Sequence, residues 1–161
     1  MSNIQHFPFK YEYPYPPLKL ITEAEVFNSM QSQNVIRIRA LWDTGAMLSA
    51  VTPEIAKKLN LISINRIKVN GIGSYCIADI VRVSIRLPNL VEIKNARISV
   101  LNLVKDVDML IGMDIIRLGD FSISNGAGKT LFTFAMPPFD DKIDLYEKAI
   151  AVNRSNNAIS S

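Results

Sequence analysis

The sequence predicts an all-β fold that carries only one or two short helices. Runs in which apolar and polar residues alternate, such as residues 35–41 and 75–87, are typical of strands with one buried face. Glycine, asparagine and proline separate these runs and favour tight turns. With 161 residues, of which 48% are apolar, the chain can bury one core. We expect an N-terminal arm over residues 1–17, one domain over 18–138, and a short helix with a polar tail over 139–161.

Charge and cysteine content exclude several classes of function. Lysine and arginine are spread singly along the chain and the net charge is only +3, so no basic block indicates binding to nucleic acid. Cys76 is the single cysteine, which excludes an internal disulfide or a multi-cysteine metal site and fits a reducing compartment. The first residues lack the features of a secretory signal, and no apolar run is long enough to span a bilayer. We expect a cytoplasmic protein whose partners include neither a membrane nor nucleic acid.

The single histidine, His6, limits the chemistry that is available. It lies in the proline- and aromatic-rich leader, where a serine or cysteine nucleophile with a histidine base is hard to build. A zinc site of the His-Glu-x-x-His kind is impossible with one histidine. If this chain hydrolyses anything, carboxylates must therefore transfer the protons.

The N-terminal third predicts an arm, a hairpin and a helix. Four prolines among aromatic residues favour an extended or irregular arm over residues 1–17. Two strand-like runs follow, 18–27 and 35–41, and could pair as a hairpin. Thr52 as N-cap, Pro53 at the first helical position and lysines in the last turn then predict a short helix.

An acidic residue, Asp43, stands at the end of the second of these strands. Gly45 lets the backbone turn sharply and approach another chain closely, and Thr44 offers a hydroxyl that both donates and accepts. The alternative to a catalytic role is an Asx-type turn in which Asp43 bonds its own backbone. The tripeptide alone favours the turn, because so short a motif recurs by chance.

The middle of the chain predicts a β-hairpin with a glycine-rich tip. Two alternating runs within residues 64–87 flank Gly71, Ile72 and Gly73. A phosphate-binding loop is disfavoured, because a third glycine and a following helix are missing. The remaining possibilities are an ordinary hairpin and a mobile element that covers a site.

The last third contains an apolar sequence, Leu110, Ile111 and Gly112, which leads into Met113 and Asp114. By itself it is consistent with a buried strand and a turn.

Beyond that point, residues 119–134 predict a further hairpin that turns at 125–128. Apolar residues within 140–152 are spaced as on a helix face, whereas 153–161 is polar and expected to fray.

In this order, the three motifs resemble the signature of retropepsins, the retroviral type of aspartic protease. The Asp-Thr-Gly-Ala sequence comes first, the glycine-rich hairpin second and the apolar-apolar-Gly motif third. The resemblance covers roughly residues 35–135 and implies an acid-protease barrel with a flap hairpin, completed by homodimerisation.

The resemblance also implies a role for each motif, without any metal or organic cofactor. The catalytic carboxylate would be Asp43. The active-site loop would continue through Thr44, Gly45 and Ala46. The flap that closes over the substrate would contain Gly71, Ile72 and Gly73. The segment that packs beside the active-site loop would be Leu110, Ile111 and Gly112.

Two residues depart from the viral pattern. Met47 stands where viral enzymes carry a second acid that anchors the substrate backbone. Trp42 is bulkier than the aliphatic residue usual before the aspartate, and we expect it to narrow the site.

Hydrolysis by carboxylates needs one group that takes a proton from water and one that gives a proton to the substrate. The chain has one such motif and no internal repeat, so the second carboxylate must come from an identical chain across a two-fold axis. The expected activity is that of an aspartic endopeptidase acting on an extended polypeptide. The alternative is a catalytically silent dimer that binds a peptide or assembles with partners.

Overall fold

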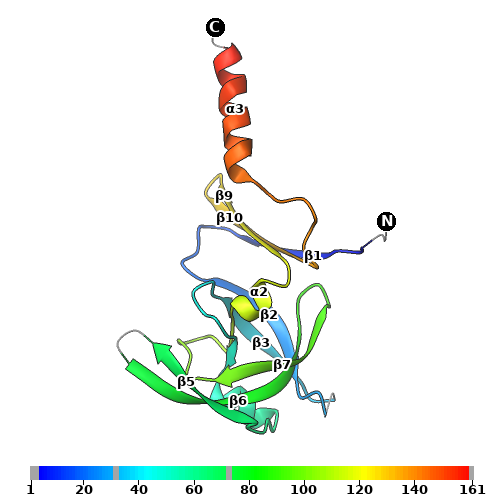
Figure 1. Cartoon of the computed structure of the whole chain (residues 1–161), viewed down its shortest axis with the longest axis vertical. Coiled ribbons are helices and arrows are strands. Elements are labelled where there is room, and N and C mark those ends of the chain that lie inside the picture. Colours follow the sequence, from blue (N-terminus) through cyan, green and yellow to red (C-terminus); the bar gives the residue numbers. More distant parts are fainter. Residues whose placement is uncertain (1–3, 31–32, 72–73, 160–161) are drawn as a thin grey trace.

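The computed structural model describes residues 4–30, 33–71 and 74–159 (Figure 1). The strands are β1 (Phe7–Tyr13), β2 (Leu20–Phe27), β3 (Val35–Trp42), β4 (Ala50–Val51), β5 (Asn65–Gly71), β6 (Ser74–Arg86), β7 (Glu92–Val100), β8 (Met109–Ile111), β9 (Asp120–Gly126) and β10 (Lys129–Met136). The helices are α1 (Pro53–Lys58), α2 (Met113–Ile116) and α3 (Leu145–Ile159). The prediction of an all-β fold is confirmed.

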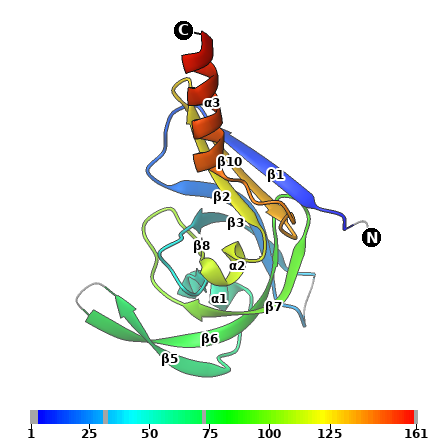
Figure 2. The same cartoon turned by 45° about the horizontal axis from the view of Figure 1, so that its top comes forward.

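Six strands close into a barrel. They are hydrogen-bonded in the order β2, β3, β8, β4, β7 and β6, and β2 also pairs with β6. The core consists of the apolar residues that alternate inward, among them Val26, Ile38, Val83, Ile98 and Ile111. The β5–β6 hairpin extends away from this barrel, as Figures 1 and 2 show.

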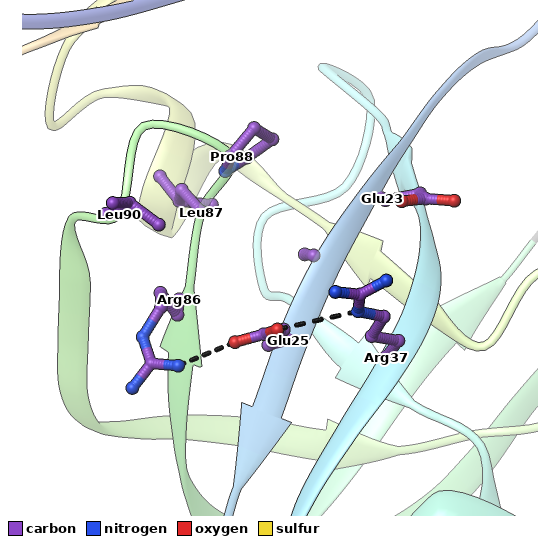
Figure 3. Close-up of a pocket in the computed structure, with 8 residues that line it drawn as sticks. Glu23, Glu25, Arg37, Arg86, Leu87, Pro88 and Leu90 are labelled. Atoms are coloured by element: carbon purple, nitrogen blue, oxygen red, sulfur yellow. Dashed lines mark hydrogen bonds and ion pairs between the residues drawn. The ribbon is translucent and has the colours of Figure 1, made fainter.

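The barrel closes at a seam of paired charges between β2 and β6. Arg86 lies 2.6 Å from the Glu25 carboxylate, which also faces Arg37 at 3.7 Å (Figure 3). Arg86 also lies 2.7 Å from the carboxylate of Glu92. The hydrogen bonds that Arg86 donates to Glu92 and Glu25 raise the pKa of its guanidinium. A cavity of about 280 Å³ beside this cluster is lined by Glu25, Arg37 and Arg86, whose charges are already paired with one another.

A second sheet contains β1, β10 and β9 in that order, all antiparallel. Residues 7–13 of the expected arm thus form a regular strand. Phe9 packs against Phe132, Trp42 and Phe134, with ring centroids 5.7, 5.9 and 6.0 Å away. The first strand is consequently part of the hydrophobic core.

Several local predictions are confirmed. β2 and β3 form the expected hairpin, and so do β9 and β10. Helix α1 begins at Pro53, and the Thr52 hydroxyl accepts the Ile55 N–H at 3.4 Å. The cap satisfies an amide that would otherwise lack a partner at the helix start.

The C-terminal helix is longer than the sequence pattern suggests. It begins at Leu145 and continues to Ile159, through residues expected to fray. The Asp144 carboxylate accepts the N–H groups of Tyr146 and Glu147 at 2.9 and 3.1 Å and so caps the first turn. In both views α3 projects from the body (Figures 1 and 2). Within the described ranges, none of the helices has the length and apolar character needed to cross a membrane.

Candidate active site

Asp43 lies where two parallel strands of the barrel end. β3 and β8 run side by side with Trp42 opposite Ile111, and the Asp43 N–H extends the ladder by donating to the Ile111 carbonyl at 2.9 Å. Ile38, Ala40 and Trp42 alternate into the core, so the next residue is directed out of it. Asp43 is accordingly only partly buried.

In the turn after Asp43, a backbone N–H donates to the Asp43 side chain, as the Asx-turn alternative predicts. The Gly45 N–H donates to Asp43 Oδ1 at 2.9 Å, and a Cβ on Gly45 would lie 3.2 Å from that oxygen. Thr44 and Gly45 are both exposed. The turn and a catalytic role are compatible, because the bond orients the carboxylate and leaves it accessible.

The loop that follows is held against the β8–α2 turn. The carbonyl of Ala46 accepts the Met113 N–H at 2.8 Å, and that of Met47 accepts the Asp114 N–H at 3.2 Å. A Cβ on Gly112 would lie 2.8 Å from the Leu48 carbonyl carbon and 2.9 Å from the Ala46 oxygen. The structure thus brings the Asp43 loop and the apolar-apolar-Gly motif into direct contact.

Ser49 and Asp114 reinforce this contact, and sequence reasoning gave neither of them a role. Ser49 is fully buried. Its N–H lies 3.0 Å from each Asp114 oxygen, and its hydroxyl donates to Asp114 Oδ1 at 2.7 Å and accepts the Gly112 N–H at 3.0 Å. The two residues are far apart in sequence, so no local pattern marks the pair.

Trp42 packs below the candidate site. Its side chain is 4% exposed, and its indole N–H donates to the Thr22 hydroxyl at 2.9 Å. Its ring lies 5.0 Å from that of Phe134 and 5.1 Å from that of Phe132. Most of its bulk is therefore accommodated in the core, where it supports Asp43, instead of filling the space above the carboxylate.

A cavity of about 440 Å³ lies beside Asp43. Its walls come from the segment before β2, from the end of β3, and from β9 and β10, and include Leu18, Leu20, Trp42, Ile123 and Thr130. The lining therefore places apolar side chains next to the polar groups of Lys19, Asn125 and Thr130 on one side of the Asp43 carboxylate. Across the described ranges, no three side chains of His, Cys, Asp or Glu gather into a metal-binding group.

On the other side of the loop, Met47 leaves an apolar surface. Its side chain is 85% exposed and shares a shallow cavity with Leu48 and Met113. A methionine cannot accept hydrogen bonds from a peptide backbone as a carboxylate does. Any ligand in this part of the site would meet thioether and aliphatic groups.

The hairpin that was expected to serve as the flap is formed by β5 and β6, and its tip lies outside the described residues. β5 and β6 pair from Asn65 opposite Ile80 to Gly71 opposite Ser74, and Ile72 and Gly73 are not among the described positions. Near the turn end of the hairpin, the Lys68 ammonium lies 3.8 Å from the centre of the Tyr75 ring. None of the described residues of this hairpin lines the cavity beside Asp43.

Three solved structures are similar to this chain. The crystal structure of a retropepsin-like aspartic protease from Rickettsia conorii is similar, with 19% identity, a TM-score of 0.52, and coverage of 84% of this chain and 98% of that one. EIAV protease complexed with the inhibitor HBY-793 has 20% identity and a TM-score of 0.46 over 61% of this chain and 85% of that one. The solution structure of simian foamy virus (mac) protease has 17% identity and a TM-score of 0.41, and the match covers 60% of this chain and 91% of that one.

No curated protein matches the sequence. A family model described as aspartyl protease matches residues 28–115, more than half of the chain and a range that includes Asp43 and Gly112. The chain therefore belongs to the aspartyl protease family.

Proposed function

We propose that this protein is an aspartic endopeptidase in which Asp43 of one chain acts together with the partner's Asp43. The observation that carries the proposal is the placement of Asp43, partly exposed at the end of β3 on a loop clamped by Gly112 and its neighbours. A carboxylate held this firmly and still accessible suits proton transfer, which depends on accurate positioning.

A second copy of the chain completes the site. One carboxylate cannot serve as acid and base in the same step, and the chain carries a single copy of the motif. Two identical carboxylates across a two-fold axis share one proton, because like charges held close together do not both ionise. Thr44, exposed beside the axis, would bond to the partner's backbone.

The reaction follows from this shared proton. The ionised carboxylate takes a proton from water as the water oxygen attacks the peptide carbonyl carbon, and the protonated carboxyl gives its proton to the carbonyl oxygen. The tetrahedral gem-diol then breaks its C–N bond as the proton gained from water passes to the amine nitrogen, and the other carboxylate takes back a proton from a gem-diol hydroxyl, which leaves a carboxylic acid and an amine. Each carboxyl group thus acts once as a base and once as an acid during one turnover.

The substrate is an extended polypeptide with apolar side chains near the bond that is cut. Leu18, Leu20 and Ile123 in the cavity beside Asp43, together with the exposed Met47, offer apolar contacts to such side chains. The hairpin of β5 and β6 would close over the bound strand, with Gly71, Ile72 and Gly73 at its tip.

The test is cleavage of a denatured protein mixture over a range of pH, with Asp43→Asn as the control. Wild type should release new peptide N-termini, a statine peptide that mimics the transition state should inhibit the release, and the Asn variant should be inactive but folded. Binding of the statine peptide without any cleavage would instead indicate a silent peptide-binding dimer. Cleavage by the Asn variant above background would remove Asp43 from the mechanism.

A further inference from the structure

A cavity of about 420 Å³ is formed by the end of β1, the segment that follows it and the start of β2. Its aromatic lining consists of Tyr11, Tyr13 and Tyr15, and we call it the tyrosine cavity. Tyr13 is held in place, because its hydroxyl donates to the Ile21 carbonyl at 2.8 Å and its ring lies 4.9 Å from that of Tyr11. The side chains of Tyr11 and Tyr15 are 44% and 66% exposed. Two accessible aromatic side chains thus stand beside a third that is fixed.

The tyrosine cavity also presents hydrogen-bond donors that donate to none of the described residues. These donors are the side-chain groups of Tyr11, Tyr15, Lys19 and Arg39. Lysine and arginine side chains only donate, and a tyrosine hydroxyl can donate or accept. A ligand that fits this lining therefore offers acceptors and needs few acceptors in return.

The two carboxylates in the lining are less available to a ligand. Glu12 lies 3.6 Å from the Lys129 ammonium. Glu23 is directly opposite Arg39 in the β2–β3 pair. A basic ligand would have to compete with these cations for the carboxylates, so the cavity is not suited to a lysine- or arginine-rich segment.

A proline-rich segment matches this lining. Proline has no N–H, and a polyproline II helix forms no internal hydrogen bonds, so its carbonyl oxygens are all available as acceptors. Proline-rich segments dock in grooves that are lined by aromatic side chains, and their preformed conformation loses little entropy on binding. The exposed tyrosines supply the aromatic faces, and the unpartnered donors supply hydrogen bonds to the carbonyls.

The tyrosine cavity adjoins the candidate active site. Pro17 and Lys19 line both the tyrosine cavity and the cavity that contains Asp43. A polypeptide bound beside Asp43 can therefore continue past Pro17 to the tyrosines along the surface of the same chain.

We propose that the tyrosine cavity binds a proline-rich segment of the polypeptide that is cleaved, at a distance from the bond that is cut. The inference rests on the proposed function, which supplies the cleavage at Asp43. A contact far from the reacting bond is made equally in the ground state and the transition state, so it lowers KM and leaves kcat unchanged.

Fluorescence anisotropy with a labelled oligoproline peptide tests the binding. The protein is the full chain with Asp43→Asn, so that cleavage does not interfere. Tyr15→Ala should weaken binding at least about tenfold, as the loss of an aromatic anchor does. Tyr15→Phe keeps the ring and loses only the donor, so its affinity should lie between the two. The matched control is Tyr146→Ala, which removes a tyrosine that is 71% exposed on α3 and should bind as its parent does.

Cleavage by the wild type tests the connection to Asp43. Two peptides share one cleavable sequence, and its flanks are oligoproline in one peptide and glycine-serine in the other. The proline peptide should have the lower KM at a similar kcat. Tyr15→Ala should remove this difference in KM, whereas Tyr146→Ala should keep it.

The outcomes separate this inference from the proposed function. Equal affinity for oligoproline and glycine-serine peptides, or equal binding by Tyr15→Ala and Tyr146→Ala, would overturn the inference, and cleavage by the wild type would still uphold the enzyme proposal. Tighter binding of a glutamate-containing glycine-serine peptide would assign the free cations to an acidic segment and also overturn the inference. Binding that depends on Tyr15 in a protein whose wild type cleaves no peptide would overturn the proposed function, and with it the assignment of the segment to a substrate.

Discussion

The substitution Gly112→Ala tests the contact on which the placement of Asp43 depends. The added Cβ would lie 2.8 Å from the Leu48 carbonyl carbon and 2.9 Å from the carbonyl oxygens of Leu48 and Ala46. All three are backbone atoms, so no flexible side chain can move aside. Gly112 has an extended backbone with φ of −95°, which alanine adopts readily, and the cost is therefore steric alone.

The expected destabilisation is about 1–3 kcal/mol, the usual cost of overpacking a close contact. For a chain of this size it corresponds to a melting temperature lower by roughly 2–12 °C. Turnover should fall further than stability, because a loop displaced by about 1 Å can cost on the order of 100-fold in rate. The assays are a thermal melt and peptide cleavage per folded molecule.

Gly126→Ala is the matched control. Nothing lies within 4 Å of a Cβ at Gly126, and its φ is not in the left-handed region, so its melting temperature should stay close to that of wild type. If Gly112→Ala melts and cleaves as this control does, the proposed packing of the Asp43 loop is incorrect.

Replacing both Gly71 and Gly73 by alanine should lower turnover more than stability if the hairpin closes over substrate, and equal cleavage per folded molecule would exclude a gating role. Asp114→Ala should cost about 1–3 kcal/mol in urea unfolding, because it leaves the buried N–H of Ser49 without its acceptor; a variant as stable as wild type would contradict this. The Ser63 hydroxyl and the Arg66 guanidinium donate to Asp79 and lower its pKa, so Asp79 stabilises the fold above the ordinary carboxyl pKa and the effect is lost as pH falls through the lowered value. Asp79→Asn should therefore be less stable than wild type at neutral pH and as stable as wild type at a pH below the lowered pKa of Asp79. A stability difference of the same size at both pH values would show that the charge of Asp79 does not stabilise the fold.

Where local rules apply, the sequence was sufficient to predict the structure. Period-two alternation identified the strands around Asp43 and Gly71, because one face of each is buried. The cap at Thr52 and the proline after it located α1. The close approach of Gly112 to the Asp43 loop followed from the family resemblance, and the structure shows the contact that makes a side chain costly there.

Features that depend on distant partners could not be predicted. The leader was expected to be an extended or irregular arm because of its prolines, and its pairing with β10 could not be predicted; Pro8 is compatible with β1, since its missing N–H would point out of the sheet. The polar end of α3 carries no apolar pattern, and the cap at Asp144 lies outside the periodic segment. Ser49 and Asp114 meet only because the fold joins them, and no spacing rule marks such a pair.

A mixing experiment shows whether Asp43 works with a second Asp43 from another chain. Inactive Asp43→Asn chains are added to a fixed amount of wild type and allowed to exchange. With equal amounts of the two, cleavage should fall to about half, because random exchange leaves about half of the wild-type chains in dimers with two carboxylates. Cleavage that stays constant however much of the variant is added would show that each chain acts alone, and would contradict the account.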